Sequence, residues 1–290
     1  MSSVVEVQPQ IRVAENRNFA LWRSQIAAIM RLEVKKNFWG KRAFLIYLLA
    51  AFPVAIIFAL TQLDSRAASD ISRYWGEAKI IYANVFEGMI LRTVVFFGCA
   101  WIFMNLFRGE IVDKSLHYYF LAPLRREVLL VGKYISGLVV SSVLFGLSTL
   151  LTLFFLYLAK GYPANIDEVL YGRGGREVLA YLGTTLFGCA GYGAFFLIVG
   201  LFFRNPIIPS LVAYGLEWIN FLLPPVLKRI SVIHYLHSLM PVPVSQGPFA
   251  MVAEPSPVWI AVPGLIITVT LVLIIAAYRI RKLEIRYGSD

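Results

Sequence analysis

Residues 134–158 read YISGLVVSSVLFGLSTLLTLFFLYL, a run of 25 residues without a charged side chain. A helix that crosses a bilayer needs about 20 mostly apolar residues, so this stretch is long enough to span a membrane. Five further apolar runs follow the same pattern: 43–60, 89–107, 178–203, 207–223 and 258–278. The sequence therefore predicts an all-α integral membrane protein whose six transmembrane helices occupy residues 43–278.

The composition excludes a soluble domain. Of the 290 residues, 59% are hydrophobic and 15% are charged, whereas a typical soluble domain has about 25% charged residues. Cys99 and Cys189 both lie inside apolar runs and form no CxxC pair. They indicate neither a disulfide framework nor a zinc site, and small apolar packing residues are the favoured interpretation.

The net charge of +10 is distributed unevenly along the chain. Lys and Arg concentrate before residue 43, in 108–133 and after residue 278, which are the segments on one side of a six-span topology. The cytoplasmic side of a membrane protein is the side enriched in Lys and Arg. We therefore expect a multi-pass protein of the plasma (inner) membrane with both termini in the cytoplasm. The charge therefore predicts contact with membrane lipids, and we expect no nucleic-acid partner.

The N-terminal region divides into a tail and a helix. Residues 1–18 are polar and are expected to form a disordered cytoplasmic tail, and residues 279–290 are expected to form a cytoplasmic tail at the other terminus. Residues 19–41 carry one helical stripe of apolar side chains, and basic side chains occupy the other positions. The stripe comprises Phe19, Trp22, Ile26, Met30, Val34 and Phe38, and the basic set is Arg23, Arg31, Lys35 and Lys36. An amphipathic helix in the membrane interface and a helix packed on another subunit both fit this pattern.

Small residues mark two spans as sites of helix contact. The span 178–203 contains Gly183, Gly188, Gly191, Gly193 and Gly200, and in the span 134–158 Ser142 and Gly146 are four residues apart. Small residues at such spacing let helix backbones approach closely in lipid. The pattern predicts packing and says nothing about a substrate.

No motif for bond chemistry is present. The sequence has no P-loop, because Gly132-Lys133 is followed by Tyr134, and it has no HExxH or GxSxG. His234 and His237 could share one helical face, but a metal site needs more ligands than these two. We therefore expect no catalytic residue, no metal and no cofactor in this chain.

The most informative polar stretch is 108–133, which reads RGEIVDKSLHYYFLAPLRREVLLVGK. Its apolar residues form one stripe of a short helix that ends near Pro123, with charges on both sides. Such a helix is too short and too charged to span a bilayer. We expect it to lie at the cytoplasmic face and to present side chains to a soluble partner.

The order of residues in this stretch resembles the permease subunits of ABC type-2 exporters. The resemblance rests on Glu110, Ser115-Leu116, Leu121-x-Pro123-x-Arg125 and Gly132-Lys133, which opens a long span. The six-span layout and the basic amphipathic N-terminal helix are similar as well. His117-Tyr118-Tyr119 is bulkier than the aliphatic stretch usual in that family.

The resemblance implies a permease that does no bond chemistry itself. A coupling helix within 110–124 would dock on a separate, soluble ABC ATPase, which would bind Mg-ATP. Two ATPase copies and a second permease chain would complete the exporter, as a homodimer or a heterodimer. Residues 226–257 would form short re-entrant helices on the outer side. The side chains expected to contact the ATPase are Glu110, Asp113, Lys114, Leu116, His117, Tyr118, Leu121 and Arg125.

Two charges fall inside predicted spans. Arg92 and Glu217 are at compatible depths, so we expect them to pair or to face one watery cavity. Tyr214 and Phe221 flank Glu217 on the same helix face and are further candidates for a pathway or gate. The alternative is structural, with a snorkelling Arg92 and a protonated or interfacial Glu217.

Two other classes of protein compete with the exporter permease. A self-contained secondary transporter or channel is the alternative function, although no internal repeat is visible in the sequence. A membrane enzyme would need clustered His, Asp or Glu at the membrane face, and the sequence lacks such a cluster.

Overall fold

The computed structural model describes residues 19–40, 43–112, 124–203, 205–222, 224, 228, 231–244 and 257–282, and all regular structure in these ranges is helical. Several predicted features lie outside the described residues. They are the tail 1–18, residues 113–123 of the coupling helix, residues 226–227, 229–230 and 245–256 of the re-entrant segment, and residues 283–290 of the C-terminal tail.

The described helical elements follow one another along the chain from Phe19 to Arg281. They are α1 (Phe19–Trp39), α2 (Ala43–Phe58), η1 (Ala59–Leu63), α3 (Ser65–Arg73), α4 (Trp75–Val85), η2 (Phe86–Val95), α5 (Phe96–Val112), α7 (Arg126–Ala159), α8 (Ala164–Leu170), α9 (Gly174–Phe202), α10 (Ile207–Trp218), η3 (Asn220–Leu222), α12 (Val232–His237) and α13 (Val258–Arg281).

Within the described residues, five helices are long and apolar enough to cross a membrane, and they indicate a multi-pass membrane protein. They cover Ala43–Leu63, Trp75–Ile111, Arg126–Ala159, Gly174–Phe202 and Val258–Arg281. The remaining predicted span, 207–223, contains α10, whose 12 residues extend about 18 Å at 1.5 Å per residue. That length covers roughly half of a 30 Å hydrocarbon core.

The second span is longer than hydropathy indicates. We predicted it over 89–107, but helix continues without a break from Trp75 to Ile111, a length of 37 residues. Its middle, Phe86–Val95, is π-helical. Glu87 therefore lies within the span and not in a polar loop before it.

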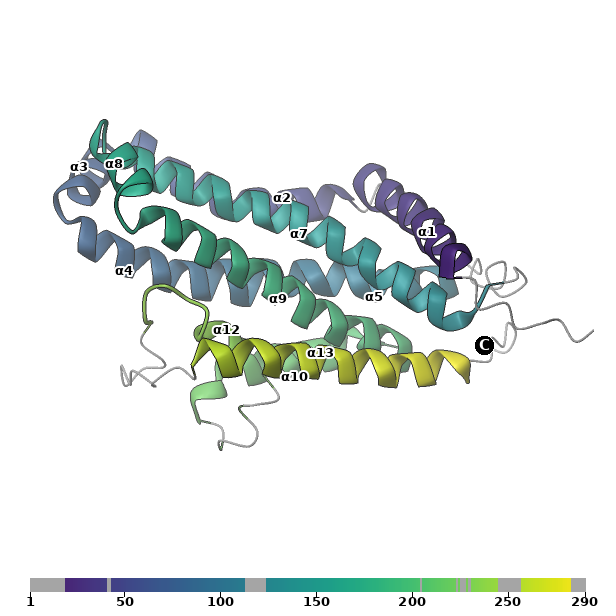
Figure 1. Cartoon of the computed structure of the whole chain (residues 1–290). Helices are drawn as coiled ribbons and strands as arrows, with labels where there is room; N and C mark the ends of the chain where they lie inside the picture. Colours follow the sequence, from purple (N-terminus) through teal and green to yellow (C-terminus); the bar gives the residue numbers. More distant parts are fainter. Residues whose placement is uncertain are drawn as a thin grey trace, which may run out of the picture.

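The long helices lie side by side, with α9 and α5 at the centre and α2 and α13 on the outside (Figure 1). Helix α1 and the C-terminal end of α13 lie at one end of the bundle, called the α1 end, and α3 and α8 lie at the other, called the α3 end. The Arg126 guanidinium donates to the carbonyls of Ile280 and Arg281, which joins the start of α7 to the end of α13 at the α1 end.

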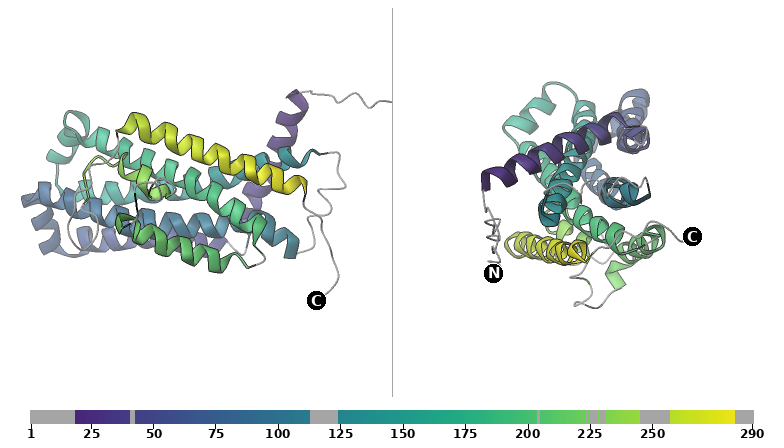
Figure 2. Two further views of the ribbon diagram at one scale, coloured as in Figure 1. Left: turned by 90° about the horizontal axis from the view of Figure 1, so that it is seen from below. Right: turned by 90° about the vertical axis from the view of Figure 1, so that its right-hand side faces the viewer.

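Helix α1 lies across the α1 end, steeply inclined to the spans (Figure 2). Its predicted apolar stripe is only partly buried, and the most buried side chains of α1 are Ile29 and Glu33. Both face α7 of the same chain. An added Cβ on Gly132 would lie 3.1 Å from Ile29, so the absence of a side chain there lets α1 approach α7 closely.

Four of the five glycines that the sequence marked on α9 face neighbouring helices, whereas a Cβ on the fifth, Gly183, would meet nothing within 4 Å. An added Cβ on Gly188 would contact Leu236, and on Gly191 it would lie 2.7 Å from Val232. At Gly200 it would lie 3.1 Å from the backbone of Met104. These close approaches pack α9 against α5 and α12.

Replacement of Gly193 by alanine tests this packing. An added Cβ would lie 2.4 Å from the fully buried ring of Phe103, so we expect the free energy of unfolding to fall by about 1–3 kcal/mol. Gly183→Ala is the matched control on the same helix, because a Cβ there meets nothing within 4 Å. Thermal unfolding in detergent measures both variants, and equal melting temperatures would contradict the packing role of Gly193.

Charged side chains join the helices at the α3 end. Lys79 of α4 lies 3.0 Å from Glu168 of α8 and 2.9 Å from Glu177 of α9, and Lys160 lies 2.7 Å from Glu168. Hydrogen bonds from Lys160 and Lys79 hold the pKa of Glu168 below its ordinary value. The network fixes α8 and the start of α9 against α4.

Candidate functional site

Four charged side chains meet at the α1 end, and we call them the Lys133 cluster: Glu33, Lys36, Glu110 and Lys133. The Lys133 ammonium is fully buried; it donates to Glu33 and lies 2.8 Å from the Glu110 carboxylate. The Lys36 ammonium lies 3.6 Å from Glu110 and is half-exposed. Among the described residues, two carboxylates and two ammonium groups therefore balance within one site.

The Lys133 cluster joins three helices. Glu33 belongs to α1, Glu110 to the last turns of α5, and Lys133 to the second turn of α7. Buried charges are tolerated when they are paired, because desolvation of an unpaired ion costs several kcal/mol. The cluster thus fixes α1 to the two helices that flank residues 113–123.

The position of Glu110 differs from the expected one. We predicted that this side chain would contact a soluble ATPase, but it is 1% exposed and bound inside the protein. Arg125 lies at the start of α7, with its guanidinium 5.3 Å from the centre of the Trp22 ring of α1. The other predicted contacts, Asp113, Lys114, Leu116, His117, Tyr118 and Leu121, lie outside the described residues.

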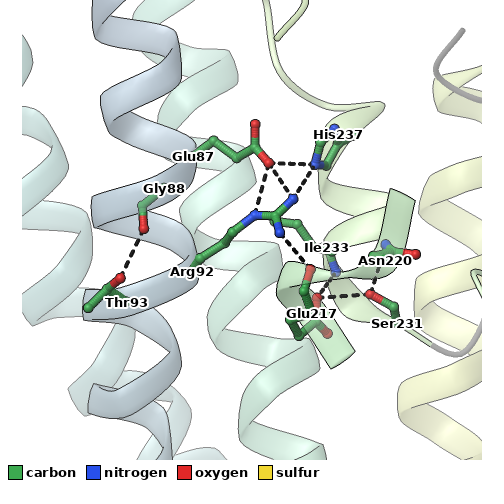
Figure 3. Close-up of polar contacts among 9 residues, drawn as sticks. All are labelled: Glu87, Gly88, Arg92, Thr93, Glu217, Asn220, Ser231, Ile233 and His237. Carbon is green, nitrogen blue, oxygen red and sulfur yellow. Dashed lines mark hydrogen bonds and ion pairs between the residues drawn. The ribbon is translucent and has the colours of Figure 1, made fainter. Parts of the chain in front are cut away.

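A second buried group surrounds Arg92, and we call it the Arg92 cluster: Glu87, Arg92, Glu217, Ser231 and His237 (Figure 3). The Arg92 guanidinium donates from Nε and Nη2 to the Glu87 carboxylate, at 2.9 and 2.6 Å. The His237 ring nitrogen Nε2 lies 2.9 Å from the same carboxylate oxygen. Arg92 and Glu87 are each less than 9% exposed.

The π-helical backbone explains why Glu87 and Arg92 meet. In a π-helix the main-chain bonds run between residues five apart, and residues at that spacing come close together. Glu87 and Arg92 are five apart, as are Gly88 and Thr93, whose hydroxyl donates to the Gly88 carbonyl at 2.9 Å. In an α-helix the neighbouring positions are three and four residues apart, so this ion pair depends on the irregular segment.

Glu217 contacts Arg92 through its main chain only. The guanidinium donates from Nη1 to the Glu217 carbonyl oxygen at 2.5 Å. The Glu217 carboxylate instead accepts from the Ser231 hydroxyl at 2.8 Å and from the amides of Val232 and Ile233 at 3.1 and 3.3 Å. The expected side-chain pair is therefore not formed, and the carboxylate satisfies the first amides of α12.

Two further candidates belong to the same region. The Tyr214 hydroxyl lies 3.4 Å from the Thr93 hydroxyl, and its ring packs against Phe96 and Phe97 with centroids 5.3 and 4.8 Å apart. Phe221 lies in η3, the single turn that follows α10. The structure thus brings Arg92, Tyr214 and Glu217 together at the contact between η2 and α10.

Sequence reasoning missed four members of these clusters: Glu33, Glu87, Ser231 and His237. The spacing of five between Glu87 and Arg92 gave no signal, because an α-helical reading separates them. His237 was considered only with His234 as a metal ligand. Among the described residues, no three His, Cys, Asp or Glu side chains are arranged to hold a metal ion.

The comparisons with known proteins add no relative. No protein-family model matches the chain, and no curated protein matches it. In the described part of the chain, the fold defines the class of protein: an all-helical, multi-pass membrane protein with a buried ion cluster at the α1 end and a second one that joins the span Trp75–Ile111 to α10 and α12.

Proposed function

We propose that this chain is the transmembrane permease subunit of an ATP-binding-cassette exporter, coupled to a separate ATPase. The observation that carries the proposal is the Lys133 cluster. One buried lysine binds α1 and α5 at the point where residues 113–123 lead from α5 to α7. Glu110 and Gly132-Lys133 are also the residues on which the resemblance to ABC type-2 permeases rests.

In the proposed mechanism, α1, α5 and α7 move together as one rigid unit. A movement of residues 113–123 driven by a partner would shift both helix ends together with α1, because buried ion pairs resist separation. Closure of two ATPase subunits on Mg-ATP would thereby shift the spans between inward and outward states. The permease would provide the pathway, and a second permease chain would complete it. The chain itself would carry no catalytic site.

The proposed topology has six crossings in the plasma (inner) membrane, with the α1 end in the cytoplasm. Helix α9 ends toward the α1 end, α10 leads back along the bundle, and α13 returns to the α1 end (Figure 1). In the proposed topology, the chain between α9 and α13 would make one further, interrupted crossing. A helix that ends inside lipid needs its polar backbone groups satisfied by protein, as Arg92 and Glu217 do here.

Copurification tests the function. The tagged chain, purified from its native membrane, should bring down a vanadate-sensitive ATPase. The double variant His117→Ala/Tyr118→Ala should lose at least about 90% of that ATPase, because truncation of contact residues can cost 2 kcal/mol or more. Tyr162→Ala/Tyr171→Ala is the matched control, with two exposed tyrosines in described positions between α7 and α9.

The second candidate function is a self-contained secondary transporter or channel. The interrupted α10 and the buried Arg92 cluster favour it, since such transporters place broken helices and charges within the membrane. A chain that purifies without an ATPase and hydrolyses no ATP in lipid nanodiscs would reject the exporter and leave this candidate.

A further inference from the structure

A pocket of about 360 Å³ opens at the α3 end, away from both ion clusters. Pockets for small ligands have volumes of roughly 300–1,000 Å³. The walls come from the end of α2 with η1, from α3, from α4 and from α7, and they are largely apolar: Ile57, Leu60, Ile71, Ile81, Val85 and Leu156. Leu60 at the rim is half-exposed, so the pocket is open to a ligand from outside the bundle.

Two carboxylates give the pocket a negative charge. Asp70 of α3 and Glu77 of α4 both line it, on either side of the break between these helices at Tyr74. Within the described part of the chain, neither carboxylate forms an ion pair or a side-chain hydrogen bond. The nearby Lys79 is already bound to Glu168 and Glu177. Both carboxylates therefore remain available to a ligand.

Two tyrosines complete the lining. Tyr74 is exposed, whereas Tyr82 is buried and is fixed by a 2.9 Å hydrogen bond between its hydroxyl and that of Thr152. The faces of aromatic rings attract cations, most strongly cations that are weakly hydrated. Carboxylates, tyrosine rings and apolar walls in one pocket match a ligand that is both apolar and positively charged.

We propose that this pocket binds hydrophobic organic cations. A neutral apolar ligand would gain nothing from Asp70 and Glu77, and an anion would be repelled by them. A compact ammonium or metal ion would leave the apolar walls empty. The site is independent of the proposed ATPase, so its test requires neither ATP nor a partner.

Tetraphenylphosphonium is a suitable probe, because tetraphenylborate has nearly the same shape and the opposite charge. We expect saturable binding of the cation to the full chain in lipid nanodiscs, above the background of empty nanodiscs. In Asp70→Asn/Glu77→Gln the dissociation constant should rise about tenfold, as expected for two exposed charges. Asp167→Asn removes an exposed carboxylate of α8 outside the pocket and should leave the constant unchanged.

Cysteine protection locates the bound probe. The native Cys99 and Cys189 are buried, so a maleimide should label an introduced, exposed Ile81→Cys selectively. Tetraphenylphosphonium should slow labelling of Ile81→Cys and should leave that of Tyr171→Cys, at an exposed site outside the pocket, unchanged. Equal affinity of the charge variant and the wild type, equal binding of tetraphenylborate, or unprotected Ile81→Cys would each overturn the proposal. None of these results depends on whether an ATPase copurifies.

Discussion

Replacement of Lys133 by methionine is expected to lower the free energy of unfolding by about 3–5 kcal/mol, the cost typical of removing one partner from a buried ion pair. The side chain is fully buried between Glu33 and Glu110, so its loss leaves two carboxylates in a site closed to water. Lys36 cannot replace it, because its ammonium lies 3.6 Å from Glu110 on the half-exposed edge of the cluster.

Thermal unfolding followed by a thiol-reactive fluorophore measures this loss, since the native cysteines are buried until the chain unfolds. Lys36→Met is the matched control and should change the free energy of unfolding by less than about 1 kcal/mol, the range of exposed pairs. The triple variant Glu33→Gln/Glu110→Gln/Lys133→Met should recover most of the loss, because it removes the unpaired charges. A Lys133→Met protein as stable as the wild type would show that the cluster does not hold α1 in place.

Hydropathy predicted the long spans because it identifies apolar runs that are long enough to cross the hydrocarbon core of a bilayer. The runs 43–60, 134–158 and 258–278 all lie inside helices of the structure. The ends of these helices were less accessible to prediction. Polar residues continue a helix beyond the apolar run, as they do before residue 89, where helix begins at Trp75.

The shortness of α10 could not be predicted from composition. The run 207–223 is nearly all apolar, yet α10 ends at Trp218, and the described residues directly after it form a single turn, Asn220–Leu222. The end depends on tertiary contacts, since Arg92 binds the Glu217 carbonyl and the Glu217 carboxylate binds the start of α12. Hydropathy carries no information about such partners.

The clusters were predictable only in part, because they combine residues distant in the sequence. Arg92 and Glu217 were identified as charges inside apolar runs, and Glu110 and Lys133 through the resemblance. Glu33 was not identified, because one acidic residue in a basic amphipathic segment gives no sign of burial. Its burial depends on Lys133, 100 residues later in the chain.

Replacement of Arg92 by methionine is expected to destabilise the protein by about 3–5 kcal/mol as well, because Glu87 would lose its buried guanidinium partner and keep His237 alone among the described residues. The destabilisation of α10 and of the start of α12 should be larger than that of the protein as a whole. Helix α10 is mostly exposed, and Ser210 and Glu217 are its buried residues, so the bond from Arg92 to the Glu217 carbonyl is one of its few anchors. We therefore expect the amides of Val232 and Ile233, which donate to the Glu217 carboxylate, to exchange with solvent faster.

Hydrogen exchange and thermal unfolding together test this expectation. Arg92→Lys should give an intermediate loss, because an ammonium group keeps the charge but cannot bind Glu87 and the Glu217 carbonyl in the same fork. Arg176→Met, at an exposed position of α9, should stay within about 0.5 kcal/mol of the wild type. If Glu87→Met/Arg92→Met is more stable than Arg92→Met alone, the cost comes from the unpaired Glu87 carboxylate. Unchanged exchange at Val232 and Ile233 in Arg92→Met would mean that α10 and α12 are anchored elsewhere, and a gating role for this cluster would lose its physical basis.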